Sequence, residues 1–111
     1  MQISERSEGD ILILSLEGRL DHAGAGIFQE KALELIRAGH RKLAIDFGGT
    51  SFVASMGIRS LIVPAQELSK VGGKFALTGL SPELHRVFEL SGLLSIFKVH
   101  DTLAEAIASL Q

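Results

Sequence analysis

Short strand-like segments and amphipathic helix-like segments alternate along the whole of this chain. Near the N-terminus, the segments Ile3 to Arg6 and Asp10 to Glu17 lie on either side of the turn signal Glu8-Gly9, which predicts a β-hairpin. Short apolar runs predict three more strands, at Lys42 to Phe47, Lys74 to Thr78 and Ile96 to Val99. Strands that are joined through helices pair in parallel, so the pattern predicts one mixed sheet.

Apolar residues that recur every three or four positions predict four helices. The clearest helix begins near Gly57, carries Ile58, Leu61 and Leu68 on one face and stops at Gly72-Gly73. The other three have these inner-face residues: Phe28, Ala32, Leu35 and Ile36 before Gly39; Leu84, Val87 and Phe88 after the expected cap Ser81; Leu103, Ile107 and Leu110 after the expected cap Asp101. The order predicts an α/β fold with about four to five strands and about four helices.

Composition limits what the chain can do. Its 111 residues are the size of one domain, so a single unit spanning residues 1–111 is expected. A net charge of -2 and aromatic residues that are all phenylalanine provide neither the basic surface nor the stacking platforms of a nucleic-acid-binding protein. Cysteine is absent, which favours a reducing compartment, so we expect a cytoplasmic protein. No apolar run approaches the ~18 residues of a membrane span, and no direct membrane insertion is expected.

The residue types that carry catalysis do not form a recognisable constellation. Four histidines are scattered over different predicted elements, without the spacing of a zinc site: His22, His40, His85 and His100. Gly24-Ala25-Gly26 opens a predicted helix, which is the context of a dinucleotide-binding turn, but Gln29 occupies the third glycine position. A small nucleotide-binding domain is therefore kept as a further alternative. We otherwise expect a protein that is not an enzyme and that holds no metal and no cofactor.

One serine lies at a position with two interpretations. Ser55 follows a buried strand and a predicted loop, at the start of the clearest helix. Its hydroxyl can act as an N-cap that accepts a hydrogen bond from a free backbone amide. The same position suits a phosphoserine, because free amides and the positive end of the helix dipole favour an anion. Met56, beside it, is either an exposed apolar contact for a partner or a core residue.

Five segments spread over nearly the whole chain carry a family resemblance: Gly18-Arg19-Leu20-Asp21, Leu43-Ala44-Ile45-Asp46-Phe47, Phe52-Val53-Ala54-Ser55-Met56-Gly57-Ile58, Gly73-Lys74-Phe75 and Leu90-Ser91-Gly92-Leu93. Together they resemble the STAS domain of bacterial anti-sigma factor antagonists. The resemblance implies a stand-alone STAS-like domain. It also implies that partners bind around Asp21, Ser55, Met56 and Gly57.

The resemblance further implies a switch between partners. Ser55 falls on the first serine of the family signature Asp-Ser-Ser/Thr-Gly-Leu, which is phosphorylated by a partner that is both a serine kinase and an anti-sigma factor. The unphosphorylated antagonist sequesters this anti-sigma factor and frees a sigma factor. The phosphorylated antagonist releases it, and a separate serine phosphatase resets the cycle.

The signature is degenerate on both sides of the serine. Ala54 stands where the family has aspartate, and Met56 stands where it has serine or threonine. The carboxylate that could orient the hydroxyl is therefore missing, so a kinase would have to supply both the base and the magnesium. Members of the family also act as accessory subunits of transport systems, including lipid-trafficking ABC transporters. A degenerate signature would suit such a role, without phosphorylation, and this is the alternative function.

Overall fold

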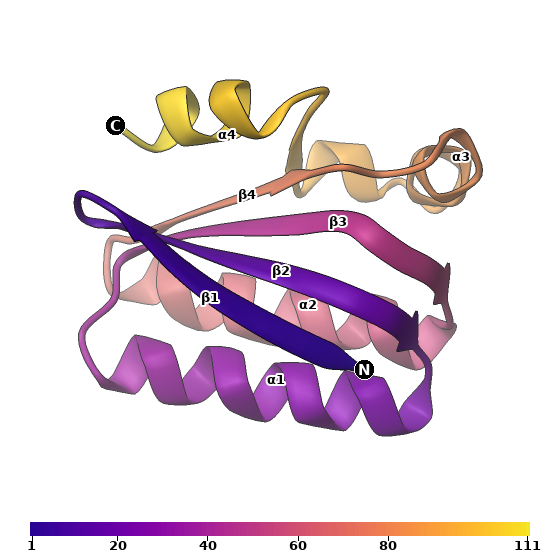
Figure 1. The fold of residues 1–111 in the computed structure, drawn as a ribbon, viewed down its shortest axis with the longest axis horizontal. Helices are drawn as coiled ribbons and strands as arrows, with labels where there is room; N and C mark the ends of the chain where they lie inside the picture. The colour runs from indigo at the N-terminus through magenta and orange to yellow at the C-terminus, as the bar shows by residue number, and fades with distance from the viewer.

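The computed structural model describes all of residues 1–111 and places five strands in one mixed sheet (Figure 1). The strands are β1 Gln2–Glu8, β2 Ile11–Leu20, β3 Lys42–Val53, β4 Lys74–Thr78 and β5 Lys98–His100. The helices are α1 His22–Arg37, α2 Ser55–Lys70, α3 Pro82–Leu90 and α4 Leu103–Leu110, with a 3-10 turn η1 at Leu93–Ser95. The strands keep their chain order across the sheet; β1 is antiparallel to β2 and all other pairs are parallel. The predicted α/β class, hairpin and order of elements are confirmed.

The sheet is covered by helices on both faces. Helices α1 and α2 lie side by side on one face and α4 lies on the other (Figure 1). The unbroken apolar run of β2 reflects this arrangement, because successive side chains of a strand point to opposite faces. Leu12 and Leu14 enter the large core beneath α1 and α2, whereas Ile11 and Ile13 enter a smaller cluster beneath α4. A strand with only one covered face would need polar residues at alternate positions.

Helix α4 packs on alanines. Ala44 of β3, Ala76 of β4 and Ala106 of α4 are all buried in the smaller cluster, together with Leu110. Small residues let the helix backbone approach the sheet closely, so each buried methyl group contributes to a layer with little spare volume. The predicted inner face of this helix is confirmed, since Leu103 and Ile107 also pack against the cluster.

Strand β3 is longer than the sequence pattern indicated. A loop was expected after Phe47, because Gly48-Gly49 is a turn signal, but the strand continues to Val53 and pairs with the end of β2. The pairing shifts register twice, as in β-bulges. The strands approach closely at one shift, since a Cβ on Gly49 would lie 2.8 Å from Cγ of Glu17 and 3.3 Å from the Leu16 carbonyl oxygen. The glycine pair therefore marks an irregular strand rather than its end.

Thr50 and Ser51 stabilise this irregular pairing through their side chains. The Thr50 hydroxyl donates to the Leu16 carbonyl at 2.9 Å, and the Ser51 hydroxyl donates to the Gly18 carbonyl at 3.3 Å. Carbonyls near the register shifts thus have partners although the regular ladder is interrupted.

Three smaller expectations were wrong. Asp101 does not cap α4: the Thr102 hydroxyl accepts from the Glu105 amide at 3.1 Å and donates to the Glu105 carboxylate. Val87 is 39% exposed, because the short helix α3 buries only Leu84 and Phe88. The last strand begins at Lys98 rather than Ile96, since its pairing with β4 starts there. The Ser81 cap is confirmed by its bond from the Leu84 amide at 3.2 Å.

The alanine layer beneath α4 yields a stability prediction. Ala44→Leu adds three carbon atoms where the side chain is fully buried, and it should lower the free energy of unfolding by about 1–3 kcal/mol through overpacking. Ala104→Leu makes the same chemical change on the exposed side of α4 and should have little effect. Urea unfolding of both variants measures this, and equal stabilities would contradict the packing described here.

Candidate functional site

Helices α1 and α2 both begin at one edge of the sheet, where β2 and β3 end. The last residues of these parallel strands, Leu20 and Val53, are paired, and the Ala54 amide donates to the Leu20 carbonyl at 3.0 Å. Asp21 follows β2 as the N-cap of α1, and Ala54 follows β3 as the N-cap of α2. The predicted partner-binding residues therefore gather at one edge of the sheet, as functional groups of α/β folds commonly do.

Two glycines bring both helix starts against the backbone of β2. A Cβ on Gly57 would lie 2.4 Å from the Leu20 carbonyl oxygen, and a Cβ on Gly24 would lie 2.4 Å from the Arg19 carbonyl oxygen. Both distances are far inside van der Waals contact, so only glycine fits at either position without movement of the helix. Gly24 and Gly57 thus have structural roles, and Gly57 sets how α2 presents Ser55 and Met56.

Ser55 is exposed and is the first helical residue of α2. The expectation that it caps the helix is wrong: Ala54 occupies the N-cap position in extended conformation, and no side chain caps α2. The helix begins one residue earlier than a Ser55 cap would require, directly after the Ala54 amide has paired with the Leu20 carbonyl. No hydrogen bond holds the Ser55 hydroxyl, whereas the hydroxyls of Ser51 and Ser60 donate to backbone carbonyls. The Ser55 hydroxyl is therefore exposed and unengaged within the domain.

Apolar and charged side chains are exposed at the edge of the sheet where α2 begins. Met56 is 42% exposed, which excludes a core role, and Phe52 at the end of β3 is 39% exposed. The Arg19 guanidinium lies over the Phe52 ring, 4.3 Å from its centroid, and its Nε lies 3.9 Å from a carboxylate oxygen of Asp21. Met56 therefore offers exposed apolar area directly after Ser55 on α2, and Phe52 offers exposed apolar area near the end of β3.

The Asp21 carboxylate is engaged inside the molecule. Its Oδ1 accepts from the Gly24 amide at 3.0 Å and so caps α1. This backbone hydrogen bond, with smaller help from the Arg19 charge, holds the pKa of Asp21 below its usual value of 3.8, although partial desolvation opposes the effect. Asp21 therefore stabilises the start of α1, next to Ser55, as well as being available at the surface.

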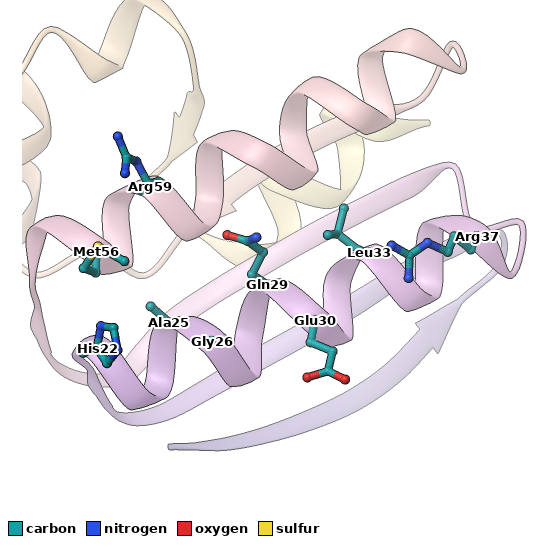
Figure 2. Close-up of a pocket in the computed structure, with 9 residues that line it drawn as sticks. All are labelled: His22, Ala25, Gly26, Gln29, Glu30, Leu33, Arg37, Met56 and Arg59. Carbon is teal, nitrogen blue, oxygen red and sulfur yellow. The ribbon is translucent and has the colours of Figure 1, made fainter.

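A groove runs between α1 and α2 from this edge (Figure 2). Its volume is about 390 Å³. The residues that line it are His22, Ala25, Gly26, Gln29, Glu30, Leu33 and Arg37 from α1, and Met56 and Arg59 from α2. His22 and Met56 lie at the end of the groove where both helices begin, and Arg37 lies at the opposite end (Figure 2). The charged groups of the groove are two arginines and one glutamate, so its character is mildly basic.

A family model described as the STAS domain matches residues 2–106. The chain belongs to the STAS domain family. Among curated relatives, BtrV of Bordetella bronchiseptica is 32% identical over 99 residues, which cover 89% of this chain and 85% of BtrV. BtrV is provisionally named an anti-sigma factor antagonist.

Solved STAS structures agree with the fold. The Thermotoga maritima protein TM1081 matches with a TM-score of 0.92 at 23% identity, over 97% of this chain and 93% of that chain. The Bacillus protein SpoIIAA, described as an anti-sigma factor antagonist, matches in its unphosphorylated form with a TM-score of 0.81 at 27% identity, over 96% of this chain and 93% of that chain. Its phosphorylated form matches with a TM-score of 0.77 at 26% identity, over 99% and 100% of the two chains.

Some residues of this STAS site were not singled out by the sequence analysis. Phe52 was recognised only as a member of the family signature, and Arg59 was not predicted to be a site residue. A usable signal existed for Arg59, because it follows Ser55 by four residues and so lies on the same side of α2. No pattern in the sequence indicated the groove, because it forms between two helices that are adjacent only in space.

No segment of α1 to α4 combines the length and the apolar character of a membrane-spanning helix.

The packing of Gly57 can be tested with a matched pair of variants. Gly57→Ala should lower the free energy of unfolding by about 1–3 kcal/mol, since the added carbon overlaps the Leu20 carbonyl. Gly26→Ala is the control: no atom lies within 4 Å of its added carbon, so it should raise stability, by up to about 1 kcal/mol, through helix propensity. Opposite signs in chemical denaturation are expected, and a stable Gly57→Ala protein would contradict the close approach.

The Asp21 cap predicts a pH dependence. The pKa of Asp21 is lower in the folded chain than in the unfolded one, so its charge stabilises the fold above about pH 4, and the stabilisation is lost as pH falls through the folded pKa. Asp21→Asn keeps a capping oxygen but cannot ionise. The stability difference between wild type and Asp21→Asn should therefore shrink from about pH 6 to about pH 2.5 in urea titrations. A difference that stays constant over this range would rule out the assigned role.

Proposed function

We propose that this STAS protein is an anti-sigma factor antagonist whose binding to an anti-sigma factor with serine kinase activity is controlled by phosphorylation of Ser55. The observation that carries the proposal is the exposed Ser55 hydroxyl, which no internal hydrogen bond holds, at the uncapped start of α2. A visiting kinase can reach this oxygen without unfolding any part of the domain.

A phosphate at this position is compatible with the folded domain. The first turn of α2 has backbone amides without side-chain caps, and the positive end of its dipole favours negative charge. A phosphate on Ser55 therefore adds close to two negative charges without losing an existing interaction of the hydroxyl. The modified protein keeps its fold and changes its surface.

The same phosphate would oppose binding of a partner. Met56 offers exposed apolar contact area directly after Ser55, and Asp21 lies at the same edge because Leu20, which precedes it, pairs with Val53 and Ala54. Burial of a dianion against such a surface is costly unless a cation of the partner meets it. The unphosphorylated form therefore binds the anti-sigma factor and frees the sigma factor, and the phosphorylated form releases it. A serine phosphatase would complete the cycle, and the cytoplasm is where these proteins would meet.

The names of relatives support this proposal. BtrV and SpoIIAA are both described as anti-sigma factor antagonists, and SpoIIAA has been solved with and without phosphorylation. The present chain has Ala54 in the N-cap position before the serine, so its own side chains provide no carboxylate at that position to orient the nucleophile. The kinase must supply both the general base and the magnesium.

The alternative is an accessory subunit of a transport system that is not phosphorylated. A sulfate transporter family protein of Wolinella succinogenes shares the fold with a TM-score of 0.81, but at 17% identity this is a likeness of fold alone. The experiments on Ser55 below distinguish this transport role from the proposed one.

Phosphorylation of Ser55 is tested by incubating the protein with ATP, magnesium and each candidate serine kinase of the genome that encodes it. Intact-mass spectrometry should show the gain of one phosphoryl group on wild type and none on Ser55→Ala. Ser51→Ala removes another exposed hydroxyl close by and should be phosphorylated like wild type. A phosphoryl group on Ser55→Ala would contradict the assigned site.

The effect of the charge is tested by binding of the same kinase. Ser55→Asp should weaken binding by about tenfold or more, because a charge enters a desolvated interface, while Ser55→Ala should bind like wild type. Equal affinities for all three proteins would contradict the switch. Co-purification with a transport ATPase, without phosphorylation at any residue, would favour the transport subunit instead.

A further inference from the structure

Ser55 and Arg59 lie four residues apart on α2, so one turn of helix places them on the same side. Both are exposed. Helical side chains lean toward the N-terminus of their helix, which directs the Arg59 guanidinium back toward Ser55. No ion pair engages Arg59; the cationic residues in ion pairs are Arg6, Arg19, Lys31, Lys42 and Lys70. A guanidinium without a partner therefore lies one turn from the proposed phosphorylation site.

We propose that Arg59 is the intramolecular partner of a phosphate carried by Ser55. Its guanidinium would donate hydrogen bonds to the phosphate oxygens and hold the group against the surface of α2. A planar fork of donors suits a phosphate, and an acidic residue placed four positions before a basic one is the favourable order in a helix. Arg59 acts here as a positioning residue. The inference rests on the proposed phosphorylation of Ser55 but not on which kinase performs it.

Other charged groups near this edge are engaged or distant. Arg19 of β2 is near Asp21 and Phe52, and the Asp21 carboxylate accepts from the Gly24 amide. His22 of α1 lies at the same end of the groove as Met56, whereas Arg37 lies at the far end (Figure 2). The N-terminal ammonium of Met1 also acts on Asp21, but it is the same in every variant and cancels from their comparison. His22 is thus the side chain other than Arg59 that can act on the phosphate, and the experiment has to separate the two.

The test uses protein in which phosphoserine is encoded at position 55 during translation, so that no kinase is needed. The pH titration of its phosphorus-31 NMR signal gives the second pKa of the phosphate, which is about 6 for a free phosphoserine. An arginine in contact favours the dianion and lowers this pKa. Arg59→Gln should raise it by about 0.3 pH unit or more. Arg59→Lys should give a smaller rise, because it keeps the charge but loses the fork.

Two controls make the result specific to Arg59. Arg37→Gln removes the same charge from the far end of the groove and should leave the phosphate pKa unchanged. The titrations are repeated with His22→Asn, since histidine titrates in the same range as the phosphate. The shift caused by Arg59→Gln should persist there. No shift in Arg59→Gln, an equal shift in Arg37→Gln, or loss of the shift with His22→Asn would each overturn the inference.

Failure of this inference is distinguishable from failure of the proposed function. If kinases modify Ser55 but Arg59→Gln leaves the phosphate pKa unchanged, only the role of Arg59 is refuted. If no kinase modifies Ser55 while the encoded phosphoserine shows the shift, the interaction stands and the physiological switch does not. Nitrogen-15 NMR of the Arg59 Nε provides an independent readout, because a hydrogen bond to phosphate changes its chemical shift in the phosphorylated protein alone.

Discussion

The close approach of two helix starts to the backbone of β2 determines the form of this protein. Gly24 and Gly57 each lie where any Cβ would overlap a carbonyl of β2, so α1 and α2 can begin directly at the edge where β2 and β3 end. Longer side chains would push the helices outward and separate their N-termini from the sheet. The groove between the helices and the exposed turn at Ser55 both depend on these two contacts, which lie in the backbone and not in the apolar core.

The candidate site lies directly after the irregular end of the β2–β3 pairing. Register shifts, a close approach at Gly49 and side-chain bonds from Thr50 and Ser51 continue the pairing to Val53, and the Ala54 amide extends it by one further hydrogen bond. The cost of interrupting the ladder is offset because the carbonyls near the shifts accept bonds from side chains. The result is that Ser55 directly follows a hydrogen-bonded strand rather than a loop.

The residues at this edge of the sheet have different roles. Asp21 stabilises the start of α1 through a backbone amide, Gly57 provides clearance for α2, and Phe52 and Met56 supply exposed apolar area. The Ser55 side chain is exposed and makes no hydrogen bond within the domain. Modification of a side chain that makes no stabilising hydrogen bond costs the fold little. This matters for a regulatory hydroxyl in a domain of only 111 residues, because such a domain is marginally stable.

The class of fold, the order of elements and the inner faces of most helices can be predicted from the amino-acid pattern, because apolar periodicity reports burial directly. The sequence also pointed to Ser55, Met56, Gly57 and Asp21 through their place in a recognisable signature. Three features became visible only in the folded chain: Ala54 rather than Ser55 occupies the N-cap position of α2, Gly48-Gly49 lies within a strand, and α1 and α2 enclose a groove that Met56 lines. Those outcomes depend on pairing between segments distant in the chain, which no local pattern of residues encodes.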